Sequence, residues 1–147
     1  MQMQGTYIAR TNNMKKGKLG WNAEAEFMLE ARQDGDRVLR VSTSKSARGL
    51  QSFASVSLHQ PNGIITHVFG AGDQGDFSER IINSDKRATE KNVRDQQQEA
   101  VDMVGKIMLR IVTHYAAVDA RSAQQAAQRT AEREARGIPY VENSPAI

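Results

Sequence analysis

The sequence predicts an α+β fold, in which a four- to five-stranded antiparallel β-meander is packed by a long C-terminal α-helix with a further helical extension. Two observations predict this fold. From Glu99 to Val118, apolar residues recur at steps of three and four, which is the period of a helix with one apolar face. Before that helix, short segments with a period of two alternate with turn sequences, as in antiparallel strands. A sheet would provide the apolar cover that the helix face needs.

The expected strands are short and joined by tight turns. Their ranges are Gly5 to Arg10, Asn22 to Arg32, Val38 to Lys45, Leu50 to Gln60 and Ile64 to Phe69. The sequences Asp-Gly-Asp at residues 34–36 and Asn-Gly at 62–63 predict hairpin turns, since these residues tolerate positive φ. Residues 22–32 obey a period of two, which places Leu29 and Ala31 inward, but their alanines and glutamates favour a helix. A helix there is the alternative to a strand.

The other segments before the long helix are interpreted as connections. Residues 11–21 combine asparagine, glycine and lysine, which indicates a mobile loop or a hairpin tip. Residues 77–83 predict a short helix or an irregular arm, and Ser84 or Thr89 is the expected helix cap. The polar stretch 89–98 predicts that the helix begins solvated and becomes packed only near Val93 or Glu99. Gly105 inside the apolar run suggests a close approach of the helix to the sheet.

Length and composition suit one α+β domain at residues 1–118, a helical extension at 119–137 ending at Gly137, and a disordered tail at 138–147. The 147 residues include no cysteine, which excludes disulfides, thiolate metal ligands and cysteine nucleophiles. No apolar run has the length of a signal sequence or a membrane span. We therefore expect a cytoplasmic protein without a membrane partner.

No motif indicates an enzyme, a metal or a cofactor. Gly70, Gly72 and Gly75 spell a dinucleotide fingerprint, but no parallel strand is expected after the helix, so we interpret the segment as a loop. His59 and His67 flank a hairpin turn, yet a zinc site needs three or four ligands. The alternating glutamates at 24–30 predict a solvated face rather than an acid–base pair. We expect a nonenzymatic protein with no catalytic residue.

Basic residues are concentrated in the strand half of the chain. Residues 1–70 contain nine Lys and Arg against five Asp and Glu, whereas residues 71–147 contain eleven against twelve. Lysine-rich loops beside an aromatic residue suit single-stranded nucleic acid, because cations contact phosphates and a ring stacks on any base. The candidate binding residues are Lys15, Lys16, Lys18, Trp21, Arg40, Lys45 and Arg48. Arg37 belongs to the same basic set, and core packing is the alternative role for Trp21 and Phe53.

These observations predict a small nonenzymatic nucleic-acid-binding protein that prefers single-stranded DNA or RNA and binds through a basic sheet face and loop. The six cations would neutralise phosphates, and Trp21 would stack on a base. The order of strands followed by one helix is similar to that of the Whirly single-stranded DNA-binding fold, in topology alone. The alternative is a protein-binding adaptor or inhibitor that docks through the alanine-rich helix Asp119 to Arg136. We expect a homodimer or a higher homo-oligomer, formed through the helices.

Overall fold

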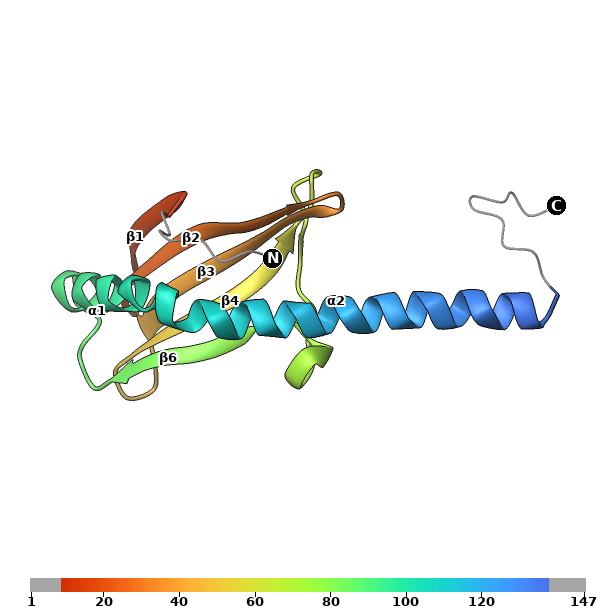
Figure 1. The fold of residues 1–147 in the computed structure, drawn as a ribbon. Helices are drawn as coiled ribbons and strands as arrows, with labels where there is room; N and C mark the ends of the chain where they lie inside the picture. The colour runs from red at the N-terminus through yellow and green to blue at the C-terminus, as the bar shows by residue number, and fades with distance from the viewer. Residues whose placement is uncertain (1–8, 138–147) are drawn as a thin grey trace.

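The computed structural model describes residues 9–137, apart from the side chain of Asp73, and confirms the α+β class: a curled antiparallel sheet is covered on one face by helices (Figure 1). The strands are β1 (Thr11–Gly17), β2 (Gly20–Arg32), β3 (Gly35–Lys45), β4 (Leu50–His59), β5 (Ile65–Thr66) and β6 (Ser78–Ser84). The helices are α1 (Glu90–Asp102) and α2 (Val104–Ala135), with a 3-10 turn η1 (Gly72–Gln74). The expected strands at residues 22–32, 38–45 and 50–60 are confirmed. Most of the expected first strand and the whole expected tail at 138–147 lie outside the described residues.

The sheet is a meander from β1 to β4, and β5 and β6 then pair with the same edge of β4. The strand order is β1-β2-β3-β4-β5, and β6 pairs with β4 off this path. β5 pairs only with Leu58 and His59, so it is much shorter than the strand expected at 64–69. β6 pairs with β4 from Leu50 to Ser55, and the expectation of a short helix or arm there was wrong. A register shift within this pairing breaks the period of two that would reveal β6 in the sequence.

β1 occupies most of the segment that was expected to be a mobile loop or a hairpin tip, and a hairpin tip is found only at residues 18–19, between Gly17 and Gly20. All seven of its residues pair with β2, from Thr11 opposite Glu26 to Gly17 opposite Gly20. β1 is an edge strand of the sheet. Lysine and asparagine suit such an edge because they discourage pairing with other chains. Its polar composition therefore reflects its position at the edge and not an absence of structure.

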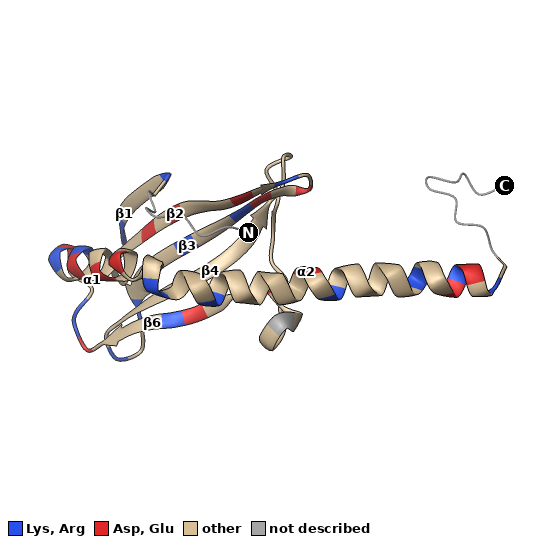
Figure 2. Ribbon diagram, viewed as in Figure 1, with Lys and Arg blue, Asp and Glu red and all other residues tan. Residues whose placement is uncertain are grey.

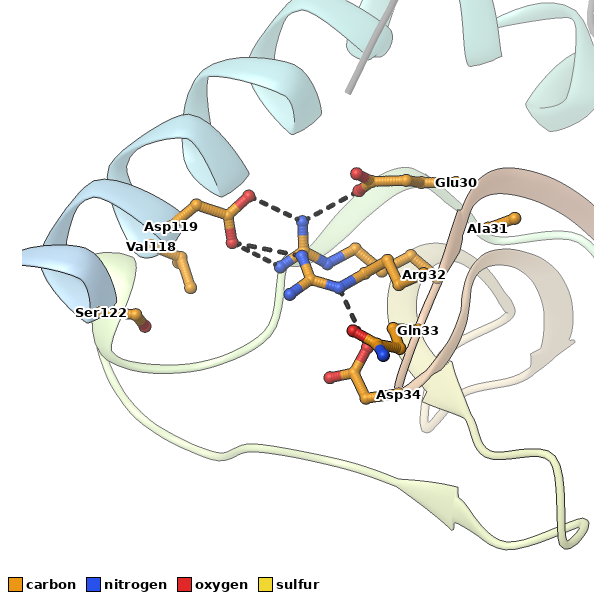
Figure 3. A pocket seen from close by; sticks show the side chains of 9 residues that line it. Glu30, Ala31, Arg32, Gln33, Asp34, Val118, Asp119 and Ser122 are labelled. Atoms are coloured by element: carbon orange, nitrogen blue, oxygen red, sulfur yellow. Dashed lines mark hydrogen bonds and ion pairs between the residues drawn. The ribbon is translucent and has the colours of Figure 1, made fainter. Parts of the chain in front are cut away.

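A β-bulge in β2 reverses the facing of its last residues. The register shifts between Met28 and Glu30, so Leu29 has no partner in β3. Before the bulge, the predicted inward residues are buried, namely Ala23, Ala25 and Phe27. After it, Glu30 and Arg32 lie on the side of α2, as Figure 3 shows, whereas Ala31 is exposed. The prediction that Ala31 faces inward was wrong because the period of two restarts at the bulge.

The apolar stripe of α2 packs on the inner face of the sheet. Its buried members are Val104, Ile107, Met108, Ile111 and Tyr115. They form one core cluster with buried residues of β2, β3 and β4, which are Ala25, Phe27, Leu39, Val41, Ala54 and Val56. Each fully buried large apolar side chain contributes roughly 1.5–3 kcal/mol relative to exposure. The predicted packing of the long helix on the sheet is thus confirmed.

Helix α1 begins with exposed residues and is packed from Val93 onward, the earlier of the two expected points, but the polar residues Gln96 and Gln97 were not expected to be buried. Gln97 Oε1 accepts a hydrogen bond from Thr43 Oγ1 at 2.7 Å, and its Nε2 donates to the Val41 carbonyl at 2.9 Å. Gln96 Nε2 donates to Ser52 Oγ at 3.1 Å. Both glutamines are buried. A buried amide is tolerated when its hydrogen bonds are made, a condition that hydropathy does not record.

The long helical region consists of two helices that meet at Met103. Thr89, one of the two predicted caps, caps α1. Met103 is the single non-helical residue between α1 and α2. A Cβ built on Gly105 has nothing within 4 Å, so the expected close approach to the sheet was wrong. α2 includes almost all of the alanine-rich segment Asp119 to Arg136, and Gly137 follows it with a φ of 72°. No helix within residues 9–137 has the length and apolar character of a membrane span.

Candidate nucleic-acid interface

Three connections meet at the end of the sheet that lies beside helix α1 (Figure 1). They are the β1–β2 turn, the β3–β4 loop at residues 46–49 and the β6–α1 loop at residues 85–89. Figure 2 shows basic residues gathered around this end of the molecule. We call it the basic end and define it by five exposed cations, Lys18, Lys45, Arg48, Lys86 and Arg87.

Two glycines allow the three connections to approach one another. Gly20 has a φ of 130°, and a Cβ on it would lie 2.6 Å from the Ala88 Cβ. The adjacent Trp21 amide donates to the Ala88 carbonyl at 2.9 Å, which holds the β6–α1 loop against the start of β2. A Cβ on Gly49 would lie 2.0 Å from the Ser84 carbonyl oxygen. A larger residue at either position would push the loops apart.

A hollow of about 450 Å³ lies between the β3–β4 loop and the β6–α1 loop. We call it the basic hollow, because four cations line it, Lys45, Arg48, Lys86 and Arg87. Asp85 also lines it. Within the described part of the chain, none of these four cations forms an ion pair with a carboxylate. Four cations against one carboxylate create a positive local potential that attracts anions.

A second hollow of about 350 Å³ lies beside the first, and Leu19 and Lys45 line both. We call it the indole hollow, because Trp21 forms part of its wall together with Asn22 and Ser44. Trp21 is half-buried and also packs against a small core cluster of Ala23, Leu50 and Val93. It therefore has the predicted alternative role in the core and still contributes to the surface. Leu19, which lines both hollows, is 74% exposed.

Six of the seven predicted binding residues are placed at or near the basic end. Lys18, Trp21, Lys45 and Arg48 line its two hollows. Lys15 and Lys16 lie on β1, opposite Asn22 and Trp21 of β2. Both lysines are exposed. The sequence thus identified most of the basic end, although Lys15 and Lys16, which were expected in a loop, lie on a strand.

Arg40 is not brought to this end. It lies in the middle of β3, where its guanidinium is 3.7 Å from the Glu24 carboxylate. It lines a separate hollow together with Phe69. Phe53 lies on a central strand away from the two hollows of the basic end, so it cannot extend their aromatic wall.

Lys86 and Arg87 were not among the binding residues predicted from the sequence. They precede the helix cap Thr89 by two or three residues, in a segment that was considered only for its capping. The loop is brought to the start of β2 by the hydrogen bond from Trp21 to Ala88, a contact over more than sixty residues of sequence. The adjacent Lys-Arg pair was visible in the sequence. The residues that lie near this pair in the fold could not be predicted from the sequence.

A hollow of about 750 Å³ elsewhere in the molecule contains charges that pair with one another (Figure 3). Arg37, which the sequence placed in the basic set, is buried there. Its guanidinium donates to both carboxylate oxygens of Asp119, at 2.8 and 3.2 Å, and to Glu30 at 3.2 Å. It also lies 4.2 Å from the centre of the Tyr115 ring, and Arg32 donates to Asp119 at 3.3 Å. We call Arg37, Arg32, Glu30 and Asp119 the latch, because they join the β2–β3 hairpin to α2.

The electrostatics of the latch indicate a structural role. Hydrogen bonds from Arg37 hold the pKa of Asp119 below its ordinary value, against the opposing effect of burial, and the nearby charge of Arg32 acts in the same direction. Both carboxylates of the latch contact a guanidinium, and Arg37 contacts both carboxylates. A charge that is already paired has little to offer an external ligand. The latch is therefore a weaker candidate binding site than the basic end.

The glycine-rich loop at 70–76 is fastened to α2 by two ring side chains. Tyr115 Oη donates to Asp76 Oδ1 at 3.0 Å and accepts from the Phe77 amide at 3.2 Å, and burial raises the pKa of Tyr115. His114 Nε2 donates to the Gly75 carbonyl at 2.8 Å. The loop leads into the antiparallel strand β6 rather than into a helix, which is not the arrangement of a dinucleotide-binding unit.

His59 and His67, the two other histidines, do not form a metal site with other described side chains. His59 Nδ1 is 3.3 Å from the Arg10 guanidinium, and the His67 ring lies beside Phe69. Among the described residues, no group of three or more His, Asp or Glu side chains is arranged to hold a metal ion. Comparisons with protein-family models, curated proteins and solved structures gave no match. A function must therefore be inferred from the geometry and charge of the surface.

Proposed function

We propose that this protein is a small nonenzymatic nucleic-acid-binding protein that prefers single strands and binds them at the basic end. One observation supports this most strongly: three connections distant in sequence bring five exposed cations together around two neighbouring hollows. Their convergence depends on Gly20 and Gly49, which accept very close contacts. Lysines scattered over the surface would not require glycine at these two positions, whereas bringing these three connections together does.

The chemistry of the basic end matches a phosphate backbone. Lysine and arginine neutralise phosphates and release the counterions that surround a nucleic acid, and this release favours binding without regard to sequence. Lys15 and Lys16 on β1 lie next to the indole hollow and would extend the contact along the strand. We propose that Arg40 and Arg37 take no part, because both contact carboxylates within the protein.

Fluorescence anisotropy with labelled single-stranded and double-stranded oligonucleotides, measured at several salt concentrations, tests this proposal. If about four cations contact phosphates of a single strand, a plot of the logarithm of the association constant against the logarithm of the salt concentration should have a slope of about −3. Lys86→Glu/Arg87→Glu should weaken binding strongly, since it replaces two attractive charges by two repulsive ones. Lys106→Glu/Arg129→Glu on α2 changes the net charge equally and should bind almost as the unmodified protein does.

Two outcomes would contradict the proposal. One is the absence of binding at low salt. The other is an equal loss of affinity in the two charge-reversed variants, since that would show a response to net charge rather than to the basic end. Circular dichroism of both variants would confirm that they are folded.

A second candidate function is that of a protein-binding adaptor that uses the part of α2 from Asp119 to Arg136. The observation that favours it is that this segment projects beyond the sheet as a helix and is largely exposed (Figure 1). Removing residues 125–147 tests it and leaves the latch residue Asp119 in place. If the arm joins copies of the chain or holds another protein, truncation should lower the sedimentation coefficient beyond the effect of lost mass, or abolish capture of the partner. Affinity for oligonucleotides should be retained.

A further inference from the structure

We infer that the two hollows of the basic end together bind one unpaired nucleotide, with its phosphate in the basic hollow and its base in the indole hollow. This inference rests on the proposed function and gives it a specific ligand geometry. The hollows are neighbours, since Leu19 and Lys45 line both. A nucleotide has the same division into a charged part and a flat, largely apolar part.

The basic hollow has the composition of a phosphate site. Lys45 and Arg48 come from one wall and Lys86 and Arg87 from the other, so cations face the hollow from two sides. Asp85 is the acidic side chain that lines it, which leaves an excess of three positive charges among the lining residues. Arginine and lysine are complementary here, because the guanidinium forms paired hydrogen bonds to phosphate oxygens and the ammonium acts as a point charge.

The indole hollow has the composition of a base site. Trp21 is among its lining residues, and a base of any identity can stack on an indole ring. Asn22 and Ser44 also line it, and their amide and hydroxyl groups can both donate and accept hydrogen bonds at a base edge. Leu19 stands between the two hollows with 74% of its surface exposed. A bound base would cover this apolar side chain, and that burial is favourable.

This division explains why a single strand should be preferred. In a duplex the bases are paired and stacked inside, so the indole hollow would remain empty while the basic hollow contacted a phosphate. In an unpaired strand the base is free to enter. The prediction is that the preference for single strands depends on Leu19 and Trp21, whereas the salt dependence depends on the four cations.

The test compares an oligothymidylate with an oligomer of the same length and charge in which every base is replaced by an abasic tetrahydrofuran unit. If the base occupies the indole hollow, the unmodified protein should bind the abasic oligomer about tenfold more weakly or worse, in line with measured base–aromatic stacking. Trp21 emission should be quenched by the oligothymidylate and unchanged by the abasic oligomer. Since the sequence contains one tryptophan, the signal reports this site alone.

Leu19→Ser provides the second arm of the test. Leu19 is largely exposed, so its replacement should leave the fold intact and should reduce the difference between the two oligomers. Leu109→Ser is the matched control, because Leu109 is 62% exposed on α2 and lines neither hollow. Equal affinity for both oligomers, with no quenching, would overturn this inference and leave the proposed function standing. If neither oligomer binds, both this inference and the proposed function are overturned.

Discussion

Replacing Asp119 by alanine should destabilise the protein, because this residue accepts the hydrogen bonds that join α2 to the β2–β3 hairpin. Arg37 donates to its two oxygens at 2.8 and 3.2 Å, and Arg32 donates at 3.3 Å. In the variant, the guanidinium of Arg37 keeps Glu30 and the Tyr115 ring but loses its bidentate partner. The side chain of Arg37 is only 9% exposed, so water cannot fully replace that partner.

The magnitude follows from exposure. Hydrogen bonds to charged groups contribute roughly 1.5–3 kcal/mol each when they are shielded from water. The Asp119 side chain is 42% exposed, and solvent screening reduces such interactions considerably. We therefore expect Asp119→Ala to lower the free energy of unfolding by about 1–2 kcal/mol.

Urea denaturation followed by circular dichroism measures this difference. Asp95→Ala is the matched control, since it is also a helical aspartate paired with a cation, Lys91, but both side chains are more than half exposed. An isolated exposed pair of this kind contributes about 0.3–0.5 kcal/mol. Equal destabilisation by the two substitutions would show that the latch contributes no more than an ordinary surface ion pair, and it would refute the reasoning.

The contribution of Asp119 should also depend on pH. Its pKa is lowered in the folded protein, mainly by hydrogen bonds from Arg37, so the folded state binds this proton less tightly than the unfolded state does. The stabilisation is therefore complete above the unfolded pKa of about 3.9 and is lost as the pH falls through the lower folded pKa. Unfolding measured from pH 7 to pH 3 should show the unmodified protein converging on Asp119→Asn at the acidic end. A constant difference across that range would contradict the assignment.

Three further predictions concern the sheet and the basic end. Gln97→Leu should lower the free energy of unfolding by about 1–3 kcal/mol in urea denaturation, because Thr43 Oγ1 and the Val41 carbonyl each lose a hydrogen bond in the interior. Gly49→Ala should lower the melting temperature and also weaken oligonucleotide binding, since the new Cβ would lie 2.0 Å from the Ser84 carbonyl oxygen and the loop must move. Arg48→Ala should leave the melting temperature nearly unchanged and reduce the salt slope of single-strand binding by about 0.7, as expected for one lost phosphate contact.

The class of fold was predictable because it depends on periodicity. The stripe of α2 and the strands β3 and β4 are continuous patterns, and the sheet that covers the helix follows from them. Two of the errors in the sheet, the facing of Ala31 and the missed strand β6, arose at irregularities of strand pairing. Leu29 is an unpaired residue in a bulge, and the register of β6 shifts where it crosses β4. Neither irregularity has a sequence signature of its own, because each depends on the partner strand.

The burial of Gln96 and Gln97 shows a second kind of limit. Both side chains are polar on any hydropathy scale. They are buried because Thr43 on β3, Ser52 on β4 and Ser84 on β6 form hydrogen bonds with them. A sequence pattern records polarity and not the availability of a partner. Hydrophobic periodicity therefore underestimates how much of α1 faces the sheet.

The basic end was partly predictable for a related reason. Lys15, Lys16 and Lys18 are close in sequence and form a visible cluster. Lys86 and Arg87 reach the same place only because the β6–α1 loop is bonded to the start of β2. Composition identifies a local concentration of charge, whereas a surface built from three connections requires the topology of the sheet.

The length of α2 sets a distance between the two regions that we propose as binding surfaces. The helix has 32 residues, which corresponds to about 48 Å along its axis, and its alanine-rich end points away from the basic end (Figure 1). A nucleic acid held at one end and a protein held on the arm would be too far apart to exclude each other. Occupancy of the two regions should then be independent, and the chain would serve as a spacer that tethers one ligand at a defined reach from the other.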